Sequence, residues 1–316
     1  MYKYETQESI KLAARLLKED GLVIFPTETV YGLGANAESK IAVSRIYSTK
    51  GRPNDHPLIV HISDMDGLNY WIDKCPDWAM NLGKVFWPGP LTLVGQRTKN
   101  AKNYITGNQE TVAVRIPSHP IAIALLRQFE AIGGKGVVAP SANRFGKVSP
   151  TTMASATKEL GNLLNKKSDY ILNGGNCEVG IESTIIDCTS STPIILRPGF
   201  ISSEMILKEL GISCDLSFNS TIKVSGQSKS HYAPAAKIII NGEAQLGDGF
   251  LALDEIETPQ GSIRIASPKS LTEFAQILYE SMRLADEKGM GRLVISIPEG
   301  DGLILAIRDR LTRAAG

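Results

Sequence analysis

Residues 22–62 of the chain read LVIFPTETVYGLGANAESKIAVSRIYSTKGRPNDHPLIVHI. The stretch starts with a β-rich run at Leu22 to Phe25, passes through a helical pattern near Ile41 to Thr49, and ends in a β-rich run at Leu58 to Ile62. Another helical pattern, near Glu8 to Glu19, precedes it. Alternation of helices with short strands favours an α/β fold. We therefore expect a twisted, mixed sheet with flanking helices.

The alternation continues along the chain and divides it into three parts. Further strands are expected at Leu91 to Val94, Val112 to Ile116, Val137 to Ala139, Tyr170 to Leu172, Ser183 to Cys188 and Ile194 to Arg197. A helix near Ser203 to Leu210 closes a first domain, residues 1–212. Residues 213–236 are polar and poorly periodic, which predicts a linker. Residues 237–316 predict a smaller α/β domain with Rossmann-like alternation.

The composition excludes several classes of protein. The 316 residues are 42% hydrophobic with a net charge of +1, so no chain-wide field attracts nucleic acid or a membrane. Four cysteines form no C-x-x-C pair and four histidines have no zinc-binding spacing, so no metal cage is expected. The first residues lack a signal-peptide pattern, and no apolar run approaches the roughly 18 residues that cross a bilayer. A cytoplasmic location is therefore expected.

A polar, glycine-containing segment follows the first strand. Pro26 to Ala35 places two threonine hydroxyls and flexible glycine backbone where α/β sheets bind ligands, although a plain polar loop has the same pattern. Gly32-x-Gly34-x-x-Ala37 also mimics a dinucleotide fingerprint. That fingerprint needs its glycines directly at a strand-to-helix turn, and here Pro26 to Tyr31 intervene. A nicotinamide dehydrogenase is therefore a distant alternative.

Three groups of cations could hold an anionic ligand. Lys50 and Arg52 end a helix, where cations commonly complement the helix dipole. Arg115 lies within a strand, on the face opposite Val114 and Ile116, and could bind a carboxylate bidentately or face solvent. Arg197, at the end of the run Ile194 to Leu196, has the same two interpretations.

Two further strands lead into short polar side chains. Val137 to Ala139 runs into Pro140-Ser141-Ala142-Asn143, and Gly180-Ile181-Glu182 runs into Ser183-Thr184. Both could donate to a phosphate or form ordinary turns. The sequence contains no G-x-S-x-G, G-x-x-x-x-G-K-[ST] or H-E-x-x-H motif. Serine hydrolases, P-loop kinases and zinc proteases therefore lose their main support.

Taken in order, seven segments resemble the motif set of the YrdC-type threonylcarbamoyl-AMP synthase family. They are PTETVYGLGA, KGRP with PLIVHI downstream, WPGPLT, VAVRIP with HP, APSAN followed by SPT, GIESTIID, and LRPG. His231-Tyr232-Ala233-Pro234 and Ala306-Ile307-x-Asp309-Arg310-Leu311 resemble the linker and second domain of the family's long, two-domain branch. In the family the linker usually reads serine-proline-glycine-methionine, with basic residues before the His-Tyr pair. Residues 224–230 of this chain depart from that pattern, so the resemblance implies no nucleotide contact for them.

The resemblance implies synthesis of threonylcarbamoyl-AMP from L-threonine, bicarbonate or carbon dioxide, and ATP, with release of pyrophosphate. It implies magnesium on the triphosphate, no organic cofactor, and a separate tRNA transferase that receives the product; direct tRNA binding is not required. Threonine is expected at Thr29, His61, Arg115 and Ser183. ATP is expected at Lys50, Arg52, His56, Thr111, Ser141, Asn143, Arg197 and Tyr232. We expect Lys50 and Arg52 to be catalytic, by stabilising developing phosphate charge.

The sequence supports two further expectations, one about the linker and one about a rival function. The linker, residues 213–236, is expected to fold over the ligand site as a lid, with Tyr232 reaching the nucleotide. The main rival function is an RNA-binding protein, because a concave basic site also accepts a phosphodiester backbone. Against it, aromatic residues make up 6% of the chain and form no visible stacking platform.

Overall fold

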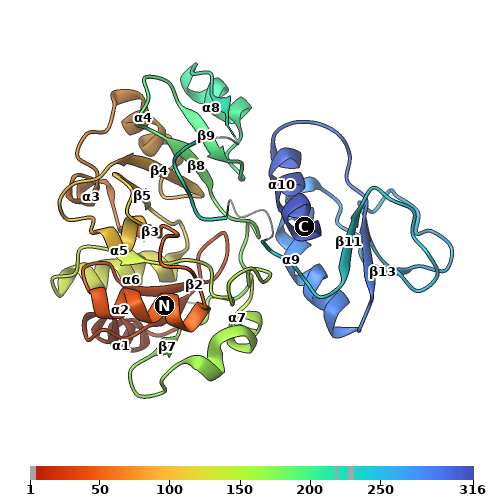
Figure 1. Cartoon of the computed structure of the whole chain (residues 1–316), viewed down its shortest axis with the longest axis horizontal. Coiled ribbons are helices and arrows are strands. Elements are labelled where there is room, and N and C mark those ends of the chain that lie inside the picture. The colour runs from red at the N-terminus through yellow and green to blue at the C-terminus, as the bar shows by residue number, and fades with distance from the viewer. Residues whose placement is uncertain (1–4, 218–219, 227–230) are drawn as a thin grey trace.

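A computed structural model describes residues 5–217, 220–226 and 231–316 of the chain. Within these residues the strands form a ten-stranded sheet, in the order β10-β9-β8-β4-β5-β3-β6-β2-β1-β7, and a four-stranded sheet, in the order β11-β14-β12-β13 (Figure 1). The larger sheet mixes parallel and antiparallel pairs, and the smaller one is parallel. The expected mixed α/β architecture with a smaller second α/β unit is confirmed.

The elements up to residue 217 are α1 (Gln7–Lys18), β1 (Val23–Phe25), β2 (Gly32–Asn36), α2 (Lys40–Lys50), β3 (Ile59–His61), η1 (Met65–Gly67), α3 (Leu68–Trp71), α4 (Asp77–Phe86), β4 (Leu91–Gln96), α5 (Asn103–Thr106), β5 (Thr111–Arg115), α6 (Pro120–Ala131), β6 (Val137–Val138), α7 (Met153–Leu160), η2 (Gly161–Leu163), β7 (Tyr170–Ile171), β8 (Thr184–Asp187), β9 (Ile194–Arg197), α8 (Ser203–Leu210) and β10 (Asp215–Leu216). The later elements are β11 (Lys237–Ile240), β12 (Gly249–Leu251), β13 (Ile263–Ala266), α9 (Leu271–Glu287), β14 (Arg292–Ile295) and α10 (Leu303–Ala315). Among the described helices, none is long and apolar enough to cross a membrane.

Strand β2 is the main local difference from the sequence-based expectation, which included no strand between Phe25 and the helix near Ile41. The strand pairs antiparallel with both β1 and β6. A Cβ on Gly34 would lie 2.8 Å from the Phe25 ring, so glycine here permits close packing between neighbouring strands. Residues 215–216, inside the predicted linker, add the edge strand β10 beside β9.

The central strands of the larger sheet present different residues to its two faces. One face packs under helices α2, α3, α4 and α8 and carries Val60, Leu93, Val114 and Ile186. The opposite face carries Ile59, Val94, Ala113 and Ile185. Helices α1 and α6 cover only the part of this second face formed by β1, β6 and β7. The remaining part meets Val224 and Ile222 of the linker, so a peptide segment covers this face of the central strands.

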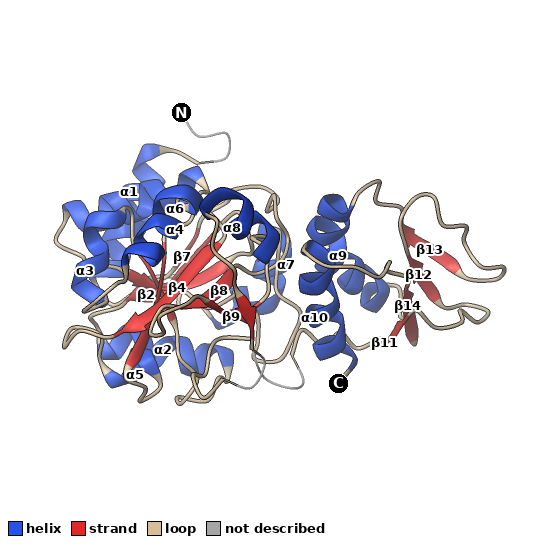
Figure 2. Ribbon diagram, turned by 90° about the horizontal axis from the view of Figure 1, so that it is seen from above, coloured by secondary structure: helices blue, strands red, loops and turns tan. Residues whose placement is uncertain are grey.

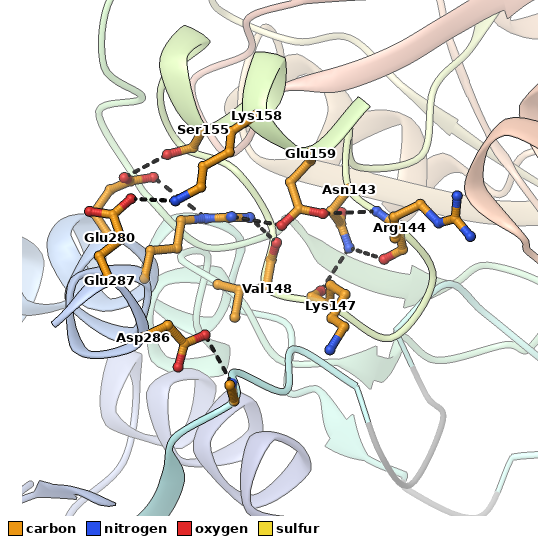
Figure 3. A network of polar contacts seen from close by, with 12 residues as sticks. Asn143, Arg144, Lys147, Val148, Ser155, Lys158, Glu159, Glu280, Asp286 and Glu287 are labelled. Atoms are coloured by element: carbon orange, nitrogen blue, oxygen red, sulfur yellow. Dashed lines mark hydrogen bonds and ion pairs between the residues drawn. The ribbon is translucent and has the colours of Figure 1, made fainter. Parts of the chain in front are cut away.

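Helices α9 and α10 lie between the smaller sheet and the first domain (Figures 1 and 2). Their apolar faces share one core with Val30, Val148 and Ile181 of the first domain. Polar contacts continue the interface at α7, where Glu280 accepts from Ser155 at 2.7 Å and Lys158 pairs with Glu287 at 2.8 Å (Figure 3). The two domains are therefore packed together over both apolar and charged surface.

Gly180 is the tightest point of this interface. Its φ is +77°, and a Cβ there would lie 2.3 Å from Gln276 Cα on α9. Gly211 has a similar φ of +66° but open space around it. We expect Gly211→Ala to lower the free energy of unfolding by about 1–2 kcal/mol, from backbone conformation alone. Gly180→Ala should lower the free energy of unfolding by about 1–3 kcal/mol more, because the added methyl group also collides with the backbone of α9. Urea unfolding measures both, and equal losses would contradict the close approach.

Candidate active site

The helix-free face of the central strands brings together polar side chains from distant parts of the sequence. In the strand register His61 lies opposite Arg115, and Thr92 lies opposite Arg115 on its other side. Side chains alternate along a strand, so His61 and Arg115 project from the same face as Ile59 and Ala113. The predicted orientation of Arg115, opposite Val114 and Ile116, is confirmed because those two side chains lie in the helix-covered core.

Arg115 is held by the segment that follows β1. Its Nη2 lies 2.6 Å from Glu28 Oε1, and its Nη1 donates to Thr29 Oγ1 at 2.9 Å. Both charged side chains are almost fully buried. The Nε of Arg115 has no hydrogen-bond partner among the described residues. The Nε–H of this buried guanidinium therefore remains for a ligand.

Ser183 and Arg197 form a second part of the site. Arg197 donates from Nε and Nη2 to the Ser183 carbonyl at 3.1 and 2.8 Å, and from Nη2 to Ser183 Oγ at 3.1 Å. Ser183 Oγ also lies 2.7 Å from Thr92 Oγ1. The remaining Nη1 of Arg197 donates to the Ser225 carbonyl of the linker at 2.8 Å. The same arginine thus joins the sheet edge to the linker.

Lys50 and Arg52 lie at the end of α2, but only Arg52 reaches the cavity. Lys50 is buried and donates to the carbonyls of Ser141 and Asn143, which fixes the loop after β6. Burial, and then the charge of Arg52, lower the pKa of the Lys50 ammonium. Arg52 donates to the Pro57 carbonyl at 3.0 Å and to Ser225 Oγ at 3.2 Å. Burial lowers the pKa of Arg52 to about 10, so it stays charged at neutral pH.

A cavity of about 50 Å³ lies between these groups and the linker. Eight residues of the predicted site line it: Thr29, Arg52, His61, Arg115, Ser141, Ser183, Arg197 and Tyr232. Its volume is far below the roughly 300–1,000 Å³ of ligand pockets. Ser225, Gly226, His231 and Tyr232 of the linker form part of its wall. ATP therefore cannot enter this conformation without movement of the linker.

The other predicted residues lie beside this cavity. Thr111 lies with Lys223 and Val224 around a smaller space over the central strands. The Asn143 amide donates to the carbonyls of Arg144 and Lys147, at 2.8 and 2.7 Å, and shapes its own loop (Figure 3). His56 packs edge-on against Phe145, whose ring also meets His231. The structure thus brings all of the predicted residues to one region, and their roles toward ligands stay predictions.

Four residues of the site were not among the sequence-predicted ligands. Glu28 pairs with Arg115, while Glu182, Ser225 and His231 line the cavity. Glu28, Glu182 and His231 stand inside the matched motifs, whereas Ser225 lies in the linker stretch that departs from the family pattern. A carboxylate beside a predicted carboxylate-binding arginine gave no signal in the sequence, since an ion pair between distant segments is visible only in the fold. The linker residues 227–230, part of the departure from the family pattern, lie outside the described residues.

Several residues that line the cavity have a buried polar atom without a partner in the described part of the chain. His61 Nδ1, His231 Nδ1 and the Tyr232 hydroxyl have no hydrogen-bond partner among the described residues. Burial lowers the pKa of both His61 and His231 to about 3, so both rings are neutral near pH 7. Buried polar groups are normally satisfied. These atoms and the Nε of Arg115 are therefore suited to a polar, anionic ligand.

The cavity is lined by buried guanidinium groups, hydroxyls and neutral histidines, and the linker forms one of its sides. Such a site defines a two-domain α/β enzyme that positions anionic substrates. Residues 15–199 match the Sua5/YciO/YrdC family model, described as "Telomere recombination". Residues 201–316 match the model described as "Threonylcarbamoyl-AMP synthase, C-terminal domain". The chain belongs to the threonylcarbamoyl-AMP synthase family, in its two-domain form, and is an adenylyl-transferring enzyme.

Named relatives are similar in sequence to this chain over almost its whole length. The threonylcarbamoyl-AMP synthase of Pyrococcus abyssi is 37% identical, over 97% of this chain and 94% of the relative. That of Bacillus subtilis is 38% identical, over 97% and 93%. A crystal structure of P. abyssi Sua5 complexed with L-threonine superimposes with a TM-score of 0.88 at 33% identity, covering 100% of this chain and 96% of that one.

Proposed function

We propose that this chain makes L-threonylcarbamoyl-AMP from L-threonine, bicarbonate or carbon dioxide, and ATP, with release of pyrophosphate. The observation that carries the proposal is Arg115, a buried guanidinium whose Nε has no hydrogen-bond partner in the described part of the chain. Arg115 lines the same cavity as Thr29, His61 and Ser183. A planar guanidinium suits an amino-acid carboxylate, and a nearby hydroxyl suits threonine's own hydroxyl. The P. abyssi relative, solved with L-threonine, supports this choice of amino acid.

In the proposed reaction the neutral amine of threonine adds to carbon dioxide and loses a proton. One oxygen of the resulting carbamate then attacks the α-phosphorus of ATP, and the bond to the β-phosphate oxygen breaks. No covalent enzyme intermediate is needed, so the protein contributes by positioning and by charge. Arg52 and Arg197 line the cavity and would face the phosphates, while Lys50 holds the Ser141–Asn143 loop against them.

Magnesium would enter with the ATP phosphates rather than in a protein cage. No group of three or more His, Cys, Asp or Glu side chains suited to a metal occurs among the described residues. The acidic side chains at the site, Glu28 and Glu182, are already paired with Arg115 and Arg310. A triphosphate supplies the hard oxygen ligands that magnesium prefers. The bound ion would neutralise charge on the leaving pyrophosphate.

The product would serve the first step of tRNA threonylcarbamoyladenosine formation, in the cytoplasm, and pass to a separate tRNA transferase. An acyl adenylate that must reach a second enzyme favours a site that closes against water. The rival RNA-binding function is not favoured, because the basic side chains lie in a narrow cavity under the linker rather than on an open groove. Direct tRNA binding is therefore not required.

Pyrophosphate release tests the proposal. With ATP, magnesium and bicarbonate, we expect turnover with L-threonine at least tenfold above that with L-valine, which lacks the hydroxyl. Release should also fall when bicarbonate and carbon dioxide are removed from the buffer. Equal release without any amino acid would reduce the chain to an ATP pyrophosphohydrolase and defeat the proposal.

The linker is expected to act as the lid of this site. Its Ser225 hydroxyl donates to the Pro57 carbonyl at 3.0 Å, and its Tyr232 is buried and stacks on Tyr279. ATP must displace residues 222–226 to reach Thr111, after which the linker can close over the bound nucleotide. Hydrogen exchange of 220–226 and 231–234 should therefore rise with a nucleotide that holds the lid open and fall with ATP and threonine together. Exchange that ignores both ligands would contradict a lid.

A further inference from the structure

Arg310 of the second domain reaches into the wall of the first domain's site. It lies on α10 and is completely buried. Its Nε donates to Glu182 Oε2 at 2.8 Å, and its Nη2 donates to the carbonyls of Pro198 at 3.0 Å and Glu182 at 3.3 Å. Its Nη1 pairs with Asp309 at 2.6 Å. A single guanidinium thus binds two loops that are separate in the sequence.

Glu182 is the acceptor at the centre of this contact and also lines the cavity. Besides Arg310, it accepts from the Tyr279 hydroxyl of α9 at 2.8 Å and from the Ser149 hydroxyl of the first domain at 2.6 Å. Burial would raise the pKa of Glu182, but the charges of Arg310 and Arg197 lower it to about 2. Its carboxylate is therefore ionised and fixed by donors from both domains.

The two loops that Arg310 binds carry proposed ligand residues. Glu182 precedes Ser183, and Pro198 follows Arg197. The loops also touch directly, because a Cβ on Gly199 would lie 2.3 Å from the Thr184 nitrogen. Arg197 in turn bonds to Ser183 and to Ser225 of the linker. Any shift of the Arg310 anchor would therefore move the threonine side, the phosphate side and the lid together.

We propose that Arg310, assisted by Tyr279, is a positioning residue for the adenylation site: the second domain aligns Ser183 and Arg197 through Glu182 and Pro198. The proposal rests on the function proposed above. It gives the C-terminal domain a defined part in the chemistry, although Arg310 is not itself one of the residues that line the cavity.

Simple docking of the domains does not account for this arrangement. The interface already has a shared apolar core and further ion pairs, such as Arg283 with Glu159 at 2.8 Å and Lys158 with Glu287 at 2.8 Å. A buried ion pair is a poor source of stability compared with well-packed apolar side chains. The planar guanidinium of Arg310 instead donates to both loops and fixes their relative geometry, which an arginine does better than a point charge.

Steady-state kinetics of three variants test the proposal, with the unaltered chain assayed in parallel. Arg310→Lys keeps the positive charge but loses the planar set of N–H donors. Tyr279→Phe removes one donor to Glu182 while keeping the ring. We expect kcat/KM to fall for both threonine and ATP, roughly 10- to 100-fold in Arg310→Lys and about 3- to 10-fold in Tyr279→Phe. Lys158→Met, which breaks an exposed ion pair of the same interface, should change neither by more than about twofold.

A double-substitution cycle identifies the route of the effect. If Arg310 acts through Glu182, Glu182→Gln combined with Arg310→Lys should lose little more than the worse single variant. Folded variants with unchanged kinetics, or fully additive losses, would overturn the proposal. If Arg310→Lys does not fold, Tyr279→Phe alone decides: unchanged kinetics overturn it. Failure of the unaltered chain to use threonine would instead defeat the proposed function.

Discussion

Replacing Arg115 by alanine is expected to raise the threonine KM roughly 10- to 150-fold while changing the ATP KM far less. A hydrogen bond to a charged group is worth about 1.5–3 kcal/mol, which corresponds to a roughly 10- to 150-fold change in affinity. The effect should be at the upper end, because Arg115 is buried and the bond forms away from water. Separate titrations of threonine and ATP measure the two constants.

The contrary interpretation is that Arg115 exists only to neutralise Glu28, 2.6 Å away. In that case Arg115→Ala would lower the melting temperature and leave the threonine KM of the folded enzyme unchanged. Arg127→Ala is the matched control, since Arg127 is exposed on α6. Its threonine and ATP constants should equal those of the unaltered chain.

Replacing Arg52 by methionine is expected to lower kcat by about 10²- to 10³-fold with smaller changes in either KM. Removal of one preorganised donor from developing charge in a transition state costs about this much. Arg52 lines the cavity, and methionine preserves much of the side-chain volume against the Phe145 ring. Loss of the positive charge of Arg52 should slow mainly the step in which the α-phosphate is attacked and pyrophosphate leaves.

Lys50→Met should also reduce turnover, but by less than Arg52→Met, since Lys50 acts through the carbonyls of Ser141 and Asn143. The exposed Lys40, at the other end of α2, provides the control Lys40→Met. Rapid-quench measurement of a single turnover separates the chemical step from product release. A single-turnover rate in Arg52→Met equal to that of the unaltered chain would mean that Arg52 serves the helix end and not the reaction.

The orientation of Arg115 could be predicted from the sequence because strand alternation is a local property. Val114 and Ile116 needed a core, so Arg115 had to face the other way. Strand β2 could not be predicted in the same manner. Its two glycines have low strand propensity. They allow close packing, of Gly34 on Phe25 and of Gly32 on Ala139, and such tertiary contacts are not visible in the sequence.

The contact between Arg310 and Glu182 lay beyond sequence reasoning for a similar reason. The two residues are 128 positions apart, and their pairing depends on how two domains pack. The motifs containing them could be recognised separately, but neither local periodicity nor charge pattern joins them. Likewise, the burial of Lys50 on loop carbonyls reflects the path of residues 141–143 and not the helix end on which Lys50 stands.

Direct detection of the product tests whether this chain makes L-threonylcarbamoyl-AMP. The full chain is incubated with ATP, magnesium, L-threonine and ¹³C-bicarbonate, and the nucleotides are analysed by mass spectrometry. We expect an AMP conjugate that contains threonine and one ¹³C atom, formed in step with pyrophosphate. An AMP-threonine conjugate without the label, or pyrophosphate with free AMP as the sole nucleotide product at the earliest times, would contradict it.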